Sequence, residues 1–158
     1  MKYQHTLKTM IAAGMIGTLL ASVSSLSWAD DSTAAAPLAL RKIMRDLGLN
    51  MQAITDGISR GDWALVAKVA PLVADHPQPP LGEKMRIMSF VGTNTPRFKA
   101  YDNQTHEQAQ EVGDAAKAKD GAGVILAFQK LQTSCYNCHN EFRKPFVAHF
   151  YGRPDAVQ

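Results

Sequence analysis

The sequence has little of what most folds and binding sites require. Only two of its 158 residues are cysteines, so it cannot build a four-cysteine zinc site. It has no dense run of lysine and arginine, which argues against nucleic-acid binding. No segment alternates apolar and polar residues as a strand does, and nothing repeats with a period of about 20–50 residues. These absences leave an all-α fold without internal repeats as the expectation.

The two cysteines belong to a motif with a specific chemistry. Cys135 and Cys138 lie three residues apart, and His139 follows at once. This spacing is typical of covalent c-type haem attachment, in which both thiols form thioethers and the histidine binds the iron. A Cys-x-x-Cys pair alone is also compatible with a redox dithiol, a strained disulfide or half of a zinc site. The adjacent histidine and the lack of a second cysteine pair favour one covalent haem c.

The first 29 residues have the pattern of a secretory signal peptide. Lys2 and Lys8 precede an apolar run over residues 10–20, and Ser27-Trp28-Ala29 is a small-x-small cleavage site. The alternative, an uncleaved membrane anchor, is disfavoured because the run is short for a span. Cleavage would leave 129 residues with a formal charge of +1, because the removed segment holds two lysines and no acid. We therefore expect a protein of the bacterial periplasm without a membrane span, since haem is attached outside the cytoplasm.

The rest of the chain is expected to form one helical domain over residues 38–151, after a flexible lead-in at 30–37 and before a tail at 152–158. The first helix has apolar side chains every three or four residues, which form one seam: Leu40, Met44, Leu47, Met51, Ile54 and Ile58. Gly57 and the segment Ser59-Arg60-Gly61 indicate where this helix ends, and Asp62 is placed to cap a second helix over 63–75. Pro71 should kink that helix or shift its boundary. Its inward positions are predicted as Leu65, Val66, Val69, Leu72 and Val73.

The middle of the chain contains two breaks and two further long helices. Residues 76–80 predict a stiff extended segment, and 82–91 a short helix. A third long helix is expected over 96–119, and a fourth from about residue 123 to Pro145. The fourth should turn these side chains inward: Val124, Ile125, Phe128, Leu131, Cys135, Cys138 and Phe142. Both cysteines therefore lie on one helical face, and the aromatic residues after Pro145 should pack on the bundle or on a partner.

With these features the sequence resembles the cytochrome c prime family, the class II c-type cytochromes. The resemblance rests on the motif at 135–139, on Phe142 and Arg143 after it, and on the first-helix segment 41–51. It implies an antiparallel up-down-up-down four-helix bundle with covalent haem on the last helix. A class I cytochrome c usually has its motif near the N-terminus and its methionine downstream, which is the reverse of this chain.

The resemblance also concerns the side chain that faces the iron opposite His139. In the family a first-helix residue takes this place: leucine or phenylalanine in pentacoordinate members, methionine in low-spin members. Met44 aligns with that methionine, which implies His139/Met44 ligation, although a methionine on a helix seam more often fills space. Met85 and Met88 are alternatives, because their short helix could fold over the haem edge.

Other polar residues are assigned smaller roles. The family counterpart of Arg143 lies beside the haem, which implies pairing with a propionate; the alternative is an exposed cation near a helix C-terminus. His76, His106 and His149 are expected to be surface or core residues rather than ligands.

Two functions follow from the two possible sixth ligands. A His/Met-ligated iron implies single-electron transfer with redox partner proteins, whereas a pentacoordinate iron implies binding of NO or CO. An enzyme such as a peroxidase is not expected, because no first-helix histidine or arginine is placed to act as a distal acid–base pair. The resemblance also implies a homodimer as a candidate assembly, since family members often pair through their first helices.

Overall fold

The computed structural model describes residues 38–152, all of which belong to the second of two units into which the chain divides, Met1–Ala34 and Ala35–Gln158. The predicted signal peptide, the lead-in and residues 153–158 of the predicted tail lie outside the described residues. The described part is helical and contains no strand. None of its helices is both long and apolar enough to cross a membrane.

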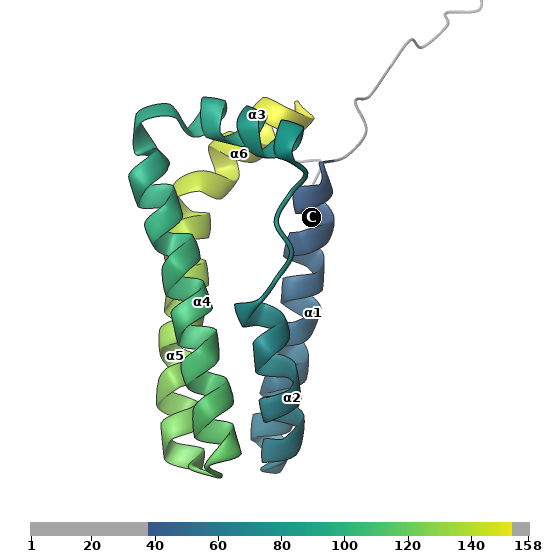
Figure 1. Ribbon diagram of the computed structural model, residues 1–158, viewed down its shortest axis with the longest axis vertical. Helices are drawn as coiled ribbons and strands as arrows, with labels where there is room; N and C mark the ends of the chain where they lie inside the picture. The colour runs from purple at the N-terminus through teal and green to yellow at the C-terminus, as the bar shows by residue number, and fades with distance from the viewer. Residues whose placement is uncertain (1–37, 153–158) are drawn as a thin grey trace, which may run out of the picture. The chain divides into compact units, whose positions relative to one another are not determined.

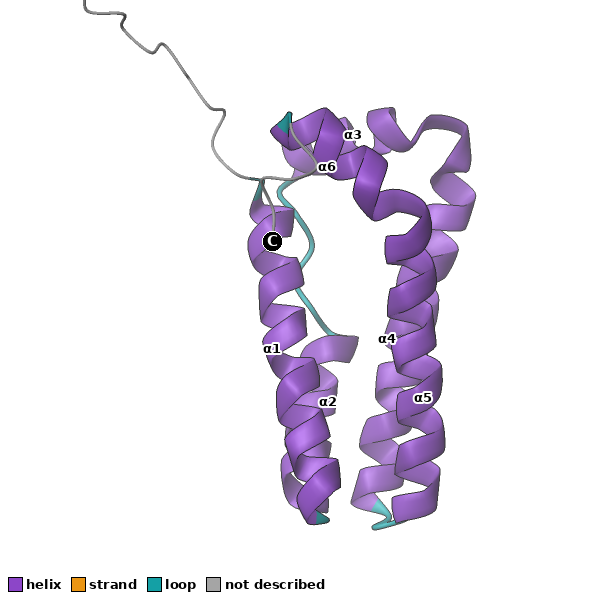
Figure 2. Ribbon diagram, turned by 180° about the vertical axis from the view of Figure 1, so that it is seen from behind, coloured by secondary structure: helices purple, strands orange, loops and turns teal. Residues whose placement is uncertain are grey.

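Four helices form the bundle: α1 (Ala39–Arg60), α2 (Trp63–Ala74), α4 (Thr95–Lys117) and α5 (Gly121–Cys138). In both views α1 runs beside α2, and α4 runs beside α5 (Figures 1 and 2). Helix α2 packs on α4 and so joins the two pairs, whereas α1 approaches α5 far less closely. The predicted four-helix bundle is confirmed, with both cysteines at the end of its last helix.

Two short helices lie together at one end of the bundle. Helix α3 (Leu81–Val91) continues through a 3₁₀ turn (Gly92–Asn94) into α4. A π-helical turn (His139–Arg143) connects α5 to α6 (Lys144–Tyr151), which lies against α3 (Figure 1). The short helix predicted over 82–91 and the extended segment before it are both confirmed.

The helix ends follow from their local chemistry. Gly61 adopts φ 66°, a left-handed conformation in which its N–H donates to the Ile58 carbonyl at 3.1 Å and ends α1. The Asp62 carboxylate accepts from the Leu65 N–H at 3.0 Å, so the predicted cap of α2 is confirmed. Asp120 caps α5 in the same way, through the Gly123 N–H at 2.9 Å, and α5 begins two residues earlier than predicted.

The two prolines inside helical segments have different consequences. Pro71 lies within α2, which ends one turn later at Ala74. The prediction that the fourth helix ends at Pro145 is wrong, because Pro145 lies in the first turn of α6. The π turn before Pro145 already departs from the α-helical hydrogen-bond pattern. Proline is tolerated in the first turn of a helix, because the N–H that it lacks would make no hydrogen bond within that helix.

The apolar interior consists of two clusters. The bundle cluster is formed by twelve buried residues of the four bundle helices: Ile54, Val66, Val69, Ala70, Val73, Ala74, Ala109, Val112, Ala116, Val124, Ala127 and Leu131. The cap cluster is centred on buried Ile87, Val91 and Phe142, with aromatic side chains of α3, α4 and α6 packed against it. The Phe146 and Phe150 rings contact Phe90, with centroids 5.8 and 5.5 Å away, so the aromatic segment after Pro145 packs back on this domain as predicted.

Two predicted inward positions are wrong. The side chain of Leu72 is 54% exposed and that of Ile125 is 59% exposed. A helix presents only one face to the core. On each of these two helices that face is formed by the neighbouring valine and by residues three or four positions away from it, so Leu72 and Ile125 point outward. The buried residues of α4 are Ala109, Val112, Gly113 and Ala116.

Candidate functional site

Cys135 and Cys138 lie on the last turn of α5, one turn apart and partly buried as free thiols. Cys135 packs against the bundle cluster, and Cys138 packs against the cap cluster. The boundary between the two clusters therefore falls between the two sulfur atoms. The sequence predicted a shared helical face for this pair but gave no indication of the divided core.

His139 follows as the first residue of the π turn, with an exposed side chain. Partial desolvation of its ring, together with the positive charge of Arg143, lowers the pKa of His139 below its usual value. A lowered pKa favours the neutral imidazole, which is the form that binds a metal ion.

Burial keeps both thiols protonated. Desolvation raises the pKa of Cys138 to about 11, and the negative charges of Asp102 and Glu141 add to the effect. Desolvation also raises the pKa of Cys135, although hydrogen bonds with Ser134 and Thr105 oppose it. Thiols in such surroundings are poor nucleophiles near neutral pH, which argues against a redox dithiol, because catalytic cysteines have lowered pKa values.

Met44 lies on α1 between residues that pack against different clusters. Its neighbour on the seam toward the N-terminus, Leu40, packs against the cap cluster, and Leu47 packs against the bundle cluster. Met44 belongs to neither cluster, and its side chain is 39% exposed. Of the alternative methionines, Met88 packs against the cap cluster and Met85 is 64% exposed.

A polar network that the sequence analysis missed holds the π turn against α4. The Tyr101 hydroxyl donates to Glu141 Oε2 at 3.1 Å, and Arg97 Nε lies 2.9 Å from the same oxygen. Glu141 is two residues after His139, so this network fixes the backbone that carries the imidazole. No sequence spacing could have indicated it, because Tyr101 and Glu141 are 40 residues apart in different helices.

Arg143 and His149 lie on exposed surface. Arg143 ends the π turn that His139 begins, and its guanidinium acts on that ring through its charge. His149 stacks on Phe90, with ring centroids 4.7 Å apart. His76 and His106 are instead partly buried, where the segment after α2 meets α4.

The geometry fits the group that the motif implies, a covalent haem. It offers two unpaired thiols on one helical face, a neutral imidazole beside them and apolar side chains of two clusters bordering the same level. The divided core suits a flat apolar ring, because such a ring gains from contact on both sides.

Comparisons with known proteins agree with this assignment. A family model described as Cytochrome C' matches residues 39–143, which is more than half of the chain. A comparison with curated proteins gives no match. Proteins of the matching family bind one covalent haem c, act as haem-containing carriers rather than enzymes, and are typically periplasmic. With its four-helix bundle and its Cys-x-x-Cys-His motif at the end of the last bundle helix, this chain belongs to the cytochrome c' family.

Proposed function

We propose that this protein is a single-electron carrier whose haem iron is bound by His139 and Met44. The observation that carries the proposal is a change of packing partner along each of two helices: on α5 it falls between Cys135 and Cys138, and on α1 it falls between Leu47 and Leu40, where Met44 lies. The Met44 side chain is 39% exposed, so its thioether is not enclosed by the core and is available to bind a metal. Ligation on both faces limits rearrangement when the iron changes charge, which suits electron transfer.

Each residue of the motif has a separate task in this proposal. Cys135 and Cys138 would hold the haem through thioether bonds, and the neutral ring of His139 would bind the iron. The bound haem supplies the one-electron chemistry, Fe(III) to Fe(II). Glu141 restrains the turn that carries His139, because it accepts from Tyr101 and pairs with Arg97. Arg143 pairs with a haem propionate, for which a guanidinium is well shaped.

The proposed location and partners follow from different observations. The signal peptide predicted at residues 1–29 and the usual location of the family both support the periplasm. Redox proteins of that compartment are the proposed partners, and a second copy of the chain is a candidate for pairing through α1.

One observation favours a second candidate function. The Met44 side chain is 39% exposed, so it is less confined than the buried side chains of the same helix. If the thioether does not bind, the iron keeps an open sixth position for NO or CO, and Met44 becomes a wall of the gas pocket.

Optical spectra of the purified holoprotein, oxidised and reduced, distinguish the two functions. The electron carrier is expected to give sharp alpha and beta bands when reduced and a weak thioether–iron band at the red edge when oxidised. A broad high-spin spectrum, with ready binding of CO to the reduced protein, would instead support the gas-binding function. Mass spectrometry should find one haem that stays on the polypeptide through acid–organic extraction, and loss of that haem would refute covalent attachment.

A further inference from the structure

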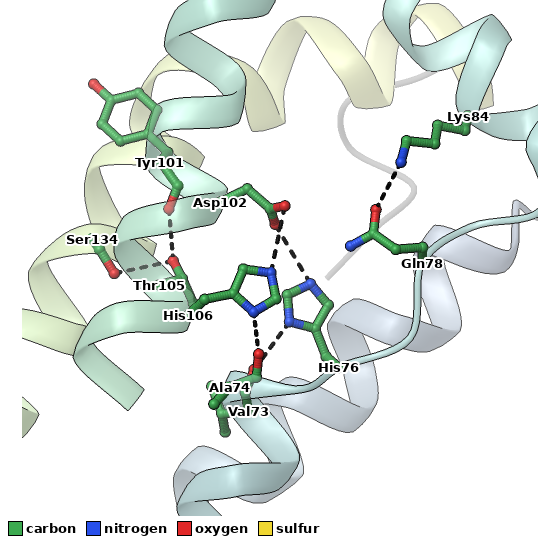
Figure 3. A network of polar contacts seen from close by, with 10 residues as sticks. All are labelled: Val73, Ala74, His76, Gln78, Lys84, Tyr101, Asp102, Thr105, His106 and Ser134. Atoms are coloured by element: carbon green, nitrogen blue, oxygen red, sulfur yellow. Dashed lines mark hydrogen bonds and ion pairs between the residues drawn. The ribbon is translucent and has the colours of Figure 1, made fainter. Parts of the chain in front are cut away.

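A second constellation of chemically active side chains lies where the segment after α2 meets α4 (Figure 3). His76 belongs to that segment, whereas Asp102 and His106 are one turn apart on α4. Asp102 Oδ1 is 3.5 Å from His76 Nε2, and Asp102 Oδ2 is 3.6 Å from His106 Nε2. One ligand atom from each of the three residues lies within 4.8 Å of the other two.

The hydrogen bonds of the two rings determine which nitrogen is free. His76 Nδ1 is 3.0 Å from the Val73 carbonyl oxygen, and His106 Nδ1 faces the Ala74 carbonyl oxygen in the same way. A carbonyl oxygen only accepts, so each Nδ1 carries a proton, and the lone pair of a neutral ring lies on Nε2, toward Asp102. Metal-bound histidines are commonly held by this contact between the other ring nitrogen and a backbone carbonyl.

The carbonyls that hold the rings belong to the end of α2. Val73 and Ala74 are the last two residues of that helix, and carbonyls at this position have no helical partner. The chain thus uses its helix end to orient both imidazoles, whose rings stack with centroids 4.6 Å apart and planes 9° from parallel. The constellation is therefore built from both sides, by a helix end and by one turn of α4.

The charges of the constellation require a cation. Both Nε2 lone pairs point toward the Asp102 carboxylate, and acceptors that face one another repel unless a positive group lies between them. A proton on one imidazole satisfies one His–Asp pair. Protons on both would place two imidazolium rings in a stack, whereas one divalent ion satisfies all three acceptors.

We propose that His76, Asp102 and His106 bind one divalent transition-metal ion, with Zn²⁺ as the best match. Tetrahedral zinc with nitrogen and oxygen ligands at about 2.0–2.2 Å holds those atoms about 3.4 Å apart, close to both His–Asp separations. The two stacked rings would turn out of their parallel arrangement so that both Nε2 lone pairs meet at the ion. Two imidazoles with one carboxylate suit zinc or copper, whereas magnesium and calcium prefer oxygen ligands. The Asp102 side chain is 39% exposed and the His76 side chain 6%, so solvent reaches the carboxylate side and can supply the remaining ligand.

The bound ion would join the proline-rich segment after α2 to α4. His76 is the only one of the three ligands outside α4, so the ion closes the loop between positions 76 and 102. A link of this kind stabilises the folded state, because the separated ligands of the unfolded chain bind the ion weakly.

The test is isothermal titration calorimetry with Zn²⁺ on tag-free, haem-loaded protein. The protein is first treated with a chelator to remove bound metal ions. We expect one Zn²⁺ per chain, and affinity at least about tenfold lower in Asp102→Asn and in His106→Gln, since even changes to groups behind the ligands often weaken metal binding by about 10–100-fold. His149→Gln is the matched control, because His149 is exposed on α6 and stacks on Phe90. The control should bind Zn²⁺ like the wild type, and Zn²⁺ should raise its Tm but not that of Asp102→Asn.

Two outcomes would overturn the proposal. One is no saturable binding of Zn²⁺ to the wild type, which would leave a proton as the bridging cation. The other is equal affinity in Asp102→Asn and His149→Gln. A measurement on the wild type alone avoids dependence on the folding of variants: pulsed electron paramagnetic resonance of bound Cu²⁺ should detect two imidazole nitrogens, and a single nitrogen or none would also refute the site.

Discussion

Met44 and Met51 share one seam of α1 but have different surroundings. Met51 packs against the bundle cluster, whereas Met44 lies between the two clusters and is 39% exposed. The sequence alone treats them alike, since both continue the same spacing of apolar positions. Their packing partners come from other helices, and only the folded chain distinguishes a side chain that fills the core from one that is available to a ligand.

Substitution of these methionines separates ligation from packing. Met44→Ala is expected to remove the thioether–iron band, convert the iron to high spin, lower the reduction potential and allow CO to bind, because it removes the proposed sixth ligand. Met51→Ala should leave the spectrum unchanged and cost about 1–3 kcal/mol of unfolding free energy, less than a fully buried methionine. Optical spectra and urea unfolding of both variants give the comparison. Identical spectra for Met44→Ala and the wild type would exclude Met44 as a ligand.

At the scale of single elements, local signals predicted most of the fold. The Asp62 cap and the proline-rich break each depend on residues close in sequence, and each is present. The predicted seam of α1 is wrong at Met44, which is 39% exposed while Ile43 beside it is buried. The N-terminus of α1 is different: the Glu83 carboxylate of α3 accepts from the Ala39 and Leu40 N–H groups at 2.7 and 2.8 Å. A carboxylate there satisfies two free donors and complements the helix dipole. Because Glu83 is more than forty residues away, no local pattern could reveal it.

Close contact between α1 and α2 depends on Gly57. A Cβ at this position would lie 2.8 Å from Val66 Cγ2 and 3.3 Å from the Asp62 carbonyl oxygen, and Val66 is fully buried. Gly57→Ala is therefore expected to destabilise the protein by about 1–3 kcal/mol, as overpacking does. Gly82→Ala in α3 is the matched control, because nothing lies within 4 Å of its Cβ position. That control should be neutral or stabilise by up to about 1 kcal/mol, since alanine favours a helix.

Thermal unfolding of the two holoproteins, read by circular dichroism, decides between these expectations. Equal Tm values for Gly57→Ala and Gly82→Ala would mean that Val66 can move aside and that the close approach of the helices adds no constraint.

At the scale of the whole molecule, the two clusters contribute unequally to stability. The bundle cluster has twelve buried residues from four helices, whereas the cap cluster has three, supported by partly exposed aromatic rings. The candidate haem site could be predicted as a motif, but its position between the clusters could not, because that position depends on how α3 and α6 close the end of the bundle. The metal constellation was not predicted either, since its ligands come from segments that meet only in the fold.

This division predicts how the protein responds when haem attachment is prevented. In a Cys135→Ser/Cys138→Ser variant the cap cluster loses the group proposed to join it to the bundle cluster, and a large unfilled space on its border costs packing energy. Hydrogen exchange followed by mass spectrometry should therefore show faster exchange in α3, α6 and the first turns of α1. Amides around Val112, Val124 and Leu131 should stay protected, because these side chains are fully buried in the bundle cluster.

The control is Tyr136→Ala, because the Tyr136 side chain is 66% exposed. This variant should keep its haem and should exchange at the wild-type rate. Unchanged exchange in the double cysteine variant would show that the cap cluster folds without the haem, and the proposed position between the clusters would then be wrong.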